Sequence, residues 1–245
     1  MLVETLSTFP GMYESVMGAS MMRIAQEKGI LAFKAHDLRD WTHDRHRTTD
    51  DEPYGGGAGL VMKCEPIYEA YEAICAQGPA VKPHTVFLAP EGRRFDDAFA
   101  CELARQERLL FVCGHYEGID ARAYELADSV VSLGDYVLTS GELASMVVID
   151  AVVRKLPGVL GAPDGAVTES FADGLLEYPQ YTRPANFRGR EVPAILLSGN
   201  HAAIARWRRE RSLERTARLR PDLLEGCALS DEDRAFLAAL EAEGK

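Results

Sequence analysis

Three segments of the chain place glycines and polar residues where a β-strand is expected to end. They cover residues 88–92, 113–120 and 133–143. In a parallel sheet the carboxyl ends of the strands share one edge, and ligands bind in the crevice beyond it. Glycine and proline there expose backbone N–H and C=O groups, which can pair with a purine edge or an amino-acid moiety. Together the three segments predict a small-molecule pocket, although any one of them could be an ordinary turn.

The common cofactor, hydrolase and metal motifs are absent from the sequence. None of the three segments is a G-x-G-x-x-G or a GxxxxGK[ST] loop, which disfavours NAD and ATP. A Gly-x-Ser-x-Gly nucleophile elbow is also missing, which lowers the expectation of a hydrolase. His43 and His46 are three residues apart, but no third ligand at a suitable spacing accompanies them. We therefore predict no metal site.

Another glycine-rich segment, residues 44–59, carries basic side chains at its start. Glycines permit close backbone approach to a ligand, and Arg45, His46 and Arg47 could hold phosphates. The alternative is a solvated turn in which the charged side chains pair with their neighbours. A lone glycine-rich loop does not decide between the two.

Two carboxylates could act as a general base. Glu169 and Asp173 lie in residues 157–174, a stretch with four glycines and two prolines that reads as a loop or linker. A base must come within hydrogen-bond reach of the proton that it removes, so burial or closure of the loop would be needed. Solvated loop acids are the common alternative.

The charge of the chain is unevenly distributed. A net charge of −11 and a pI near 5.1 would normally count against a nucleic-acid partner, because polyanions repel acidic proteins. Residues 200–220, however, hold seven arginines against only Glu210 and Glu214, and Trp207 lies among them. Tyr181 adds a further aromatic residue just upstream. This basic and aromatic pattern favours RNA contact over a merely solvated helix face.

Apolar strands alternate with helical segments along the first two thirds of the chain. This alternation indicates an α/β domain with a mostly parallel sheet covered on both faces. The strands are expected at residues 2–9, 85–90, 108–114 and 129–138, and the helices at 12–28, 60–77, 99–106 and 142–155. Beyond the turn-rich stretch, helices at 202–218 and 230–240 predict a small helical C-terminal domain.

Composition excludes several other classes of protein. The chain has 245 residues, 47% of them apolar and 27% charged, which is typical of a folded globular protein. No apolar run approaches the roughly 20 residues of a membrane helix, and the N-terminus does not resemble a signal peptide, so we expect a cytoplasmic protein. Five widely spaced cysteines without a CxxC pair argue against a disulfide framework and a cysteine zinc site.

Seven segments together identify a family resemblance over essentially the whole length. They read THDRHRTTDDEPYGGGAGL, LAPEGRRF, VCGHYEGIDAR, SLGDYVLTSGEL, PGVLG, SFADGLLEYPQYTRP and LLSGNHAAIARWRRERSL. In this order they resemble the bacterial tRNA (guanine-37-N1)-methyltransferases of the SPOUT class. The resemblance implies a knotted α/β cofactor-binding domain at 1–160, a flexible linker carrying the base at 161–175, and a helical tRNA-binding domain at 176–245. It also implies a deep trefoil knot and a homodimer whose active sites are shared between subunits.

The resemblance implies S-adenosylmethionine as cofactor and assigns roles to individual residues. Glu169 stands where the family has the aspartate that serves as base, and Arg154 matches the arginine that stabilises the guanine. The expected cofactor contacts are Leu88, Pro90, Gly114, Glu117, Leu133, Gly134, Asp135, Tyr136, Val137, Leu138 and Gly141. The expected substrate contacts are Arg45, His46, Asp50, Arg154, Ser170, Tyr181, Arg183, Arg206, Arg208 and Arg209.

The implied reaction is transfer of a methyl group to N1 of guanine 37 of tRNA, next to the anticodon. The partner would be tRNA and a second copy of the chain, with no DNA and no membrane. Two alternatives remain at this point: a SPOUT methyltransferase acting on another RNA position, and a catalytically silent module that binds RNA or cofactor.

Overall fold

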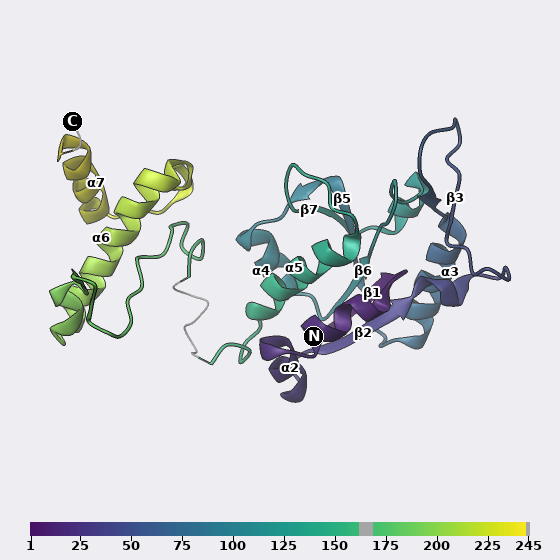
Figure 1. The fold of residues 1–245 in the computed structure, drawn as a ribbon, viewed down its shortest axis with the longest axis horizontal. Coiled ribbons are helices and arrows are strands. Elements are labelled where there is room, and N and C mark those ends of the chain that lie inside the picture. The colour runs from purple at the N-terminus through teal and green to yellow at the C-terminus, as the bar shows by residue number, and fades with distance from the viewer. Residues whose placement is uncertain (162–168, 244–245) are drawn as a thin grey trace. The chain divides into compact units, whose positions relative to one another are not determined.

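Five parallel strands form the sheet at the centre of the first of two units in the chain (Figure 1). The computed structural model describes residues 1–161 and 169–243, and it divides into units of residues 1–161 and 162–245. Part of the predicted linker, residues 162–168, lies outside the described residues. The strands, in their order across the sheet, are β2 (Ala32–Asp37), β1 (Leu2–Ser7), β6 (Arg108–Val112), β5 (His84–Arg94) and β7 (Ser129–Ser132). The predicted α/β fold with a parallel sheet is confirmed.

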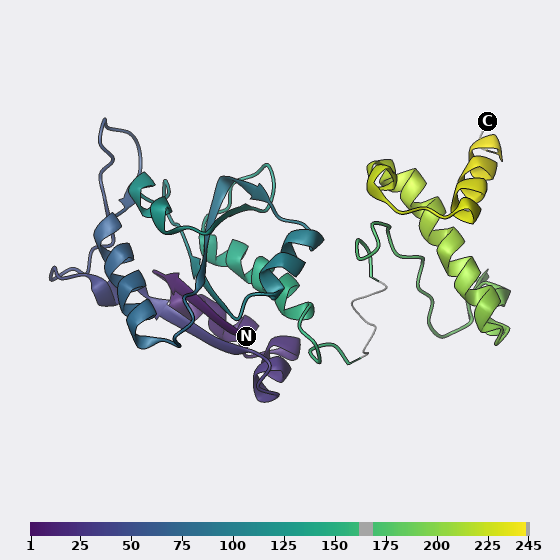
Figure 2. The same cartoon turned by 180° about the vertical axis from the view of Figure 1, so that it is seen from behind.

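Helices cover both faces of this sheet (Figure 1, Figure 2). Successive side chains of a strand point to opposite faces. Leu109 and Phe111 of β6 accordingly pack in one apolar cluster with α5, whereas Leu110 and Val112 pack in another with α3. The helices of this unit are α1 (Glu14–Met17), α2 (Ser20–Glu27), α3 (Cys64–Gln77), α4 (Asp97–Ala104) and α5 (Gly141–Arg154). Of three short 3₁₀ helices, η1 (Pro10–Tyr13) connects β1 to α1, whereas η2 (Leu38–Trp41) and η3 (Ala121–Leu126) lie in connections between strands.

Several predicted element boundaries were wrong. The helix predicted over 12–28 is broken into η1, α1 and α2 around Gly18, and Ser20 takes a positive φ of 46°. Strand β7 ends at Ser132 instead of residue 138, because Gly134 turns the chain with a φ of +143°. Strand β5 continues past Pro90 to Arg94, since its pairing with β6 ends at Phe87 and an irregularity in its β7 pairing takes up the proline.

Strands β2, β3 and β4 of this unit were not predicted. Strand β2 carries Lys34, His36 and Asp37 beside Phe33 and two alanines, so its sequence lacks the apolar run of a central strand, and it lies at the edge of the sheet. Residues Val61–Met62 form β4, which pairs with β3 (Asp50–Asp51), where the start of a helix was expected. Tertiary pairing decides both cases.

A buried ion cluster joins three neighbouring strands of the sheet. The Glu4 carboxylate of β1 lies 2.9 Å from Nε2 of His36 on β2 and 2.7 Å from Nε of Arg108 on β6. Arg108 also donates to the backbone oxygens of Ile74 and Val81. Burial by itself would raise the pKa of Glu4, but the hydrogen bonds from His36 and Arg108 outweigh burial and lower it. Glu4 is therefore an ionised carboxylate whose charge is fully compensated.

The second unit is built around one long helix, α6 (His201–Leu219), with α7 (Asp231–Glu243) beside it. Asn200 caps α6, because its side-chain oxygen accepts a hydrogen bond from the Ala203 amide. The two helices are pinned together by Arg209 of α6 and Asp233 of α7 at 2.9 Å. A small hairpin of β8 (Asn186–Phe187) and β9 (Arg190–Glu191) and the 3₁₀ helices η4 (Ala194–Leu197) and η5 (Pro221–Gly226) complete the unit.

Within residues 1–161 and 169–243, none of the helices combines the length and the apolar character that crossing a bilayer requires.

Candidate active site

The three predicted segments meet around one cavity of about 680 Å³ at the carboxyl edge of the sheet. Residues 113–120 and 133–143 follow β6 and β7, but residues 88–92 belong to β5 itself, so the predicted strand end at this position was wrong. The loop after β6 and the loop after β7 are joined directly. His115 and Ser140 form an antiparallel bridge, and the Gly141 amide donates to the Gly114 carbonyl at 2.8 Å. The cavity therefore lies where an open parallel sheet places its ligands.

Gly141 sets how closely these two loops approach. A Cβ at this position would lie 2.7 Å from the Gly114 nitrogen and 2.9 Å from the Cα of Cys113. Both of these neighbours are backbone atoms, so they cannot move aside as a flexible side chain would. The loop geometry around the cavity depends on glycine at position 141.

The structure brings together all but one of the residues predicted to contact the cofactor. Asp135 alone does not line the cavity, although it belongs to the loop that does. Large apolar side chains at the lip, those of Tyr116, Tyr136 and Val137, are exposed. Glu91 and Glu117 add carboxylates to the lining. The cavity thus combines apolar contact surface with negative charge.

Sequence reasoning missed part of the wall. Ala121, Tyr124, Val130 and Val131 line the cavity but lie outside the three predicted segments. Val130 and Val131 belong to strand β7, and Tyr124 to η3. Their apolar types gave no signal beyond that of ordinary core residues. Only the packing of η3 and β7 beside the loops places them at the cavity.

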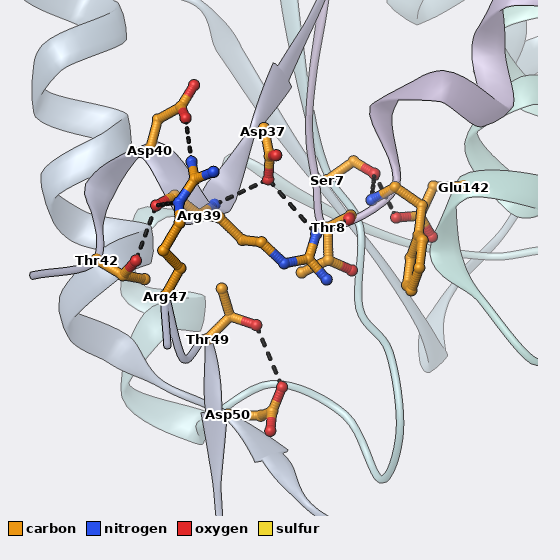
Figure 3. A network of polar contacts seen from close by, with 11 residues as sticks. Ser7, Thr8, Asp37, Arg39, Asp40, Thr42, Arg47, Thr49, Asp50 and Glu142 are labelled. Carbon is orange, nitrogen blue, oxygen red and sulfur yellow. Dashed lines mark hydrogen bonds and ion pairs between the residues drawn. The ribbon is translucent and has the colours of Figure 1, made fainter. Parts of the chain in front are cut away.

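A buried carboxylate lies behind the cavity. Glu142, at the start of α5, is fully buried, and one of its oxygens accepts a hydrogen bond from Ser7 Oγ (Figure 3). The other oxygen lies 3.1 Å from Nε2 of His115. The His115 ring in turn packs against Phe9, with 4.8 Å between the ring centroids. These contacts tie the cavity loop after β6 to the end of β1.

Cys113, the first residue of the segment 113–120, is poorly suited to act as a nucleophile. Its thiol is buried, and burial together with the nearby charge of Glu142 raises its pKa to about 12. The Tyr13 hydroxyl lies 3.2 Å from this sulfur and 2.7 Å from Ser145 Oγ. Burial also raises the pKa of Tyr13. A neutral thiol and a neutral phenol make this a structural hydrogen-bond cluster.

The basic residues of the 44–59 segment lie outside the cavity lining, and two of them make local contacts. Asp44 accepts hydrogen bonds from the His46 and Thr48 amides, and Arg47 pairs with Asp40 (Figure 3). Arg45 and His46 are exposed, and Asp50 accepts a hydrogen bond from Thr49.

The end of this segment does reach the cavity. The Glu117 amide donates to the Leu60 carbonyl at 3.0 Å, and the Met62 amide donates to the Gly118 carbonyl at 2.9 Å. The segment around β3 extends away from the sheet in Figure 1, and Tyr54 within it is fully exposed. The glycine-rich segment is therefore anchored beside the cavity at one end and projects into solvent at the other.

The two predicted catalytic residues lie in different units. Arg154 is the last residue of α5 and is half-buried. Glu169 is half-buried at the start of the described part of the second unit, where its backbone oxygen accepts from the Ala172 amide at 3.2 Å. Ser170 uses its hydroxyl oxygen to accept from the Glu177 amide at 2.9 Å.

Asp173, the competing carboxylate, already has structural partners. One oxygen lies 2.7 Å from Nη1 of Arg209, and the other accepts from the Leu175 amide at 3.2 Å. Leu175 is buried, and the Leu176 amide donates to Thr216 of α6. Asp173 therefore fastens this loop to α6.

The three arginines of α6 that were predicted to contact the substrate divide into two groups. Arg209 is held between Asp173 and Asp233, so its charge is compensated by two carboxylates. Arg206 and Arg208 are exposed; Arg206 pairs with Glu210 at 2.9 Å, and the Arg208 guanidinium stacks 4.8 Å from the Tyr178 ring centroid. Of the two groups, the exposed one is better placed to meet phosphates.

No group of three or more His, Cys, Asp or Glu side chains in the described parts of the chain is arranged to hold a metal ion.

Comparison with known proteins shows similarity along the whole chain. A model of the family described as tRNA (guanine-1)-methyltransferase TrmD matches residues 1–226. The chain is 54% identical over 242 residues to a Geobacter metallireducens protein named tRNA (guanine-N(1)-)-methyltransferase, and the match covers 98% of each. Proteins of that name from Moorella thermoacetica and Listeria innocua are 52% and 49% identical; these matches cover 97% of this chain and 95% and 97% of those proteins. The similarity includes both the cavity and α6.

Proposed function

The chain belongs to the tRNA (guanine-1)-methyltransferase family, and from that premise we propose that it methylates N1 of guanine 37, the nucleotide next to the tRNA anticodon. The observation that carries this proposal is the cavity at the carboxyl edge of the sheet. This chain is about half identical to proteins named tRNA (guanine-N(1)-)-methyltransferase, and the similarity includes the residues that line the cavity. Because we propose tRNA as the substrate, we also propose that the protein acts in the cytoplasm.

The cavity suits S-adenosylmethionine, the methyl donor that we propose. When bound, this cofactor supplies an activated methyl group on a positively charged sulfonium. The volume of the cavity, about 680 Å³, lies within the range of roughly 300–1,000 Å³ that small-molecule sites occupy. Ser140 Oγ lines the cavity, is buried and has no hydrogen-bond partner among the described residues, so it can serve a bound molecule.

We assign the cofactor's groups to parts of the lining by chemistry. Leu88, Leu133 and Leu138 offer apolar surface for the purine ring, and the backbone groups of Gly114 and Gly134 can pair with its edge. The carboxylate of Glu117 suits the cationic end of the molecule.

A Gly141→Ala change is expected to weaken cofactor binding and to destabilise the fold. The added methyl group would meet the Gly114 and Cys113 backbone at 2.7 and 2.9 Å, which forces the two cavity loops apart. Overpacking of this kind costs about 1–3 kcal/mol. Urea unfolding and calorimetric titration with S-adenosylmethionine measure the two effects. Gly161→Ala is the matched control, because a Cβ there meets no atom of residues 1–161 and 169–243 within 4 Å; equal behaviour of the two variants would contradict the prediction.

Methyl transfer to N1 requires removal of a proton, because guanine N1 is protonated at neutral pH and is then a poor nucleophile. We propose that Glu169 accepts this proton. We propose further that Arg154 donates to O6, where negative charge develops as the proton leaves. Asp173, which pairs with Arg209, is the competing carboxylate.

Glutamate is longer by one methylene than the family's aspartate, which moves the carboxylate by about 1.5 Å. The loop that follows is fastened to α6 through Asp173 and Leu176. We propose that the backbone at position 169 is set to accommodate the longer side chain.

Exposed residues of both units are proposed to bind the tRNA. Arg206, Arg208 and Arg183 would contact phosphates, and Tyr181 would contact a base. Arg45, His46 and Asp50 would contact the substrate from the glycine-rich segment of the first unit. Ser170, which follows Glu169 in the sequence, would contact the substrate next to the proposed general base. For Arg209 we propose a positioning role, because Asp173 and Asp233 already hold its charge.

A second copy of the chain is proposed to complete the active site. Leu143 and Val147, one turn apart on α5, are exposed apolar side chains. Phe9, Met12 and Val16, on and beside the 3₁₀ helix that packs against α5, are exposed as well. A contiguous apolar surface of this kind is typical of a homodimer interface.

We also propose that the loops around the cavity form the trefoil knot of the SPOUT class. The support for this is the close approach of the loops after β6 and β7, which the hydrogen bond from the Gly141 amide to the Gly114 carbonyl joins at 2.8 Å and which leaves no room for a Cβ at position 141.

Incubation with labelled S-adenosylmethionine and tRNA carrying guanosine 37 is expected to give 1-methylguanosine at that position. Digestion and mass mapping of the nucleosides identify both the product and its position. A methyl group elsewhere in the RNA would indicate a related enzyme with another target. Tight binding of tRNA and cofactor by folded protein without any product would indicate a silent binding module, and would overturn the proposal.

A further inference from the structure

We propose that a pocket in the second unit binds one unpaired nucleobase of the substrate RNA, an inference that rests on the proposed tRNA function. The pocket has a volume of about 320 Å³ and lies between the segment from Tyr178 to Ala185, η4 and the first turns of α6. It belongs wholly to the second unit and is separate from the cavity proposed for the cofactor.

The walls of this pocket suit a flat aromatic ring. Tyr178 and Tyr181 face it from one segment, and Leu196, Leu197 and Ile204 supply aliphatic surface. Tyr181 is about half exposed and Leu197 about two thirds exposed, which is unusual for large apolar side chains at the surface. A base that stacked on the tyrosine would cover this surface, and any base can do so because each has a π-face.

The charge at the pocket is complementary to a nucleotide. Among the described residues that line it, two are arginines, Arg183 and Arg208, and none is acidic. The Arg208 guanidinium stacks 4.8 Å from the Tyr178 ring centroid, which orients it at the pocket wall, and no described carboxylate pairs with it or with Arg183. In a chain with a net charge of −11, an apolar pocket flanked by two uncompensated arginines favours a phosphate-bearing ligand.

The size of the pocket limits the occupant to one nucleotide. Its volume of about 320 Å³ lies at the lower end of the range for small-molecule sites, roughly 300–1,000 Å³, so a base pair or a duplex end would not enter. The base must therefore be unpaired. Arg183 or Arg208 would hold the phosphate that flanks it.

The test compares full-length variants by the affinity for a tRNA substrate, measured by fluorescence anisotropy. Tyr181→Ala removes the stacking platform, and Ala185→Trp fills the pocket from an exposed position. Each is expected to weaken binding roughly 5-fold to 150-fold, the range found for loss of one stacked base. Phe187→Ala is the matched control, because Phe187 is an exposed aromatic residue of the same unit that does not line the pocket; its affinity should equal that of the unchanged protein.

A second set of measurements replaces the unpaired nucleotides of the tRNA one at a time with abasic ones. An abasic nucleotide at one position should weaken binding to the unchanged protein by the same factor as Tyr181→Ala does. The same abasic nucleotide should cause no further loss of affinity in the Tyr181→Ala protein. Losses that simply add at every position, or a Phe187→Ala protein as weak as Tyr181→Ala, would overturn the inference. Thermal unfolding of each variant separates lost binding from lost folding.

The inference and the proposed function fail in different ways. If 1-methylguanosine forms normally, but the losses of tRNA affinity from each abasic position and from Tyr181→Ala simply add, then the proposed nucleobase pocket is wrong and the proposed reaction stands. Base-dependent binding that requires Tyr181, together with no 1-methylguanosine, would overturn the proposed reaction and leave the pocket intact.

Discussion

Replacing Glu169 with alanine is expected to abolish methyl transfer to tRNA while cofactor affinity stays nearly unchanged. A general base contributes roughly 10²–10⁴-fold to rate, so the turnover number should fall by that factor. The cofactor cavity lies in the first unit and does not include Glu169, so binding of S-adenosylmethionine alone should not depend on it. Single-turnover transfer with labelled cofactor and calorimetric titration measure the two quantities separately.

Two further variants test whether position 169 supplies the base itself. Glu169→Gln keeps the length of the side chain but removes its basic oxygen, and should be as inactive as Glu169→Ala. Asp173→Asn removes the competing carboxylate and should keep most of the turnover in protein that remains folded. Full activity of Glu169→Gln combined with loss in Asp173→Asn would move the base to Asp173, despite its ion pair with Arg209.

Replacing Arg108 with methionine is expected to lower the free energy of unfolding of the first unit by about 3–5 kcal/mol, the cost of breaking a buried ion pair. Arg108 is 2% exposed, and its loss would leave the Glu4 carboxylate buried with only His36 beside it. The Ile74 carbonyl at the end of α3 would also lose one of its two donors and keep the Gly78 amide. Urea unfolding of the full chain gives the change. Arg105→Met is the control, because Arg105 is exposed at the end of α4 and should have an effect near zero.

The cluster of Glu4, His36 and Arg108 is also expected to make the stability of the fold depend on pH. The pKa of Glu4 is lower in the folded chain than in the unfolded chain, so its ionised form stabilises the fold above the ordinary carboxyl range. That contribution is lost as the pH falls through the folded pKa. The Arg108→Met protein should therefore lose less stability on acidification than the unchanged protein. An equal acid dependence in both would show that the cluster does not couple to folding.

Local sequence was sufficient for much of the fold and for the position of the cavity. The apolar run of β6 and the glycines after it carry their own structural signal, because burial and turn formation are properties of a few neighbouring residues. Parallel strands then bring their carboxyl ends together whatever lies between them in sequence. This is why the segments at 88–92, 113–120 and 133–143 could be expected at one site.

Ion pairs and strand pairing between residues far apart in the chain could not be predicted from local sequence. The chemical types of Arg206 and Arg209 are the same, yet only Arg209 is held by Asp173 and Asp233, which are 36 and 24 residues away. Edge strand β2 forms because β1 offers it a partner, although its own residues are weakly apolar.

The amino-acid sequence by itself thus determined the family, the parallel α/β architecture and the loops that surround the cavity, since these follow from residue type and local order. Tertiary structure alone decided which charged groups are compensated. It commits Asp173 and Arg209 to each other and buries Glu142 against Ser7 and His115. The physical reason is that a charge acts through its distance to other charges and to water, and folding sets both.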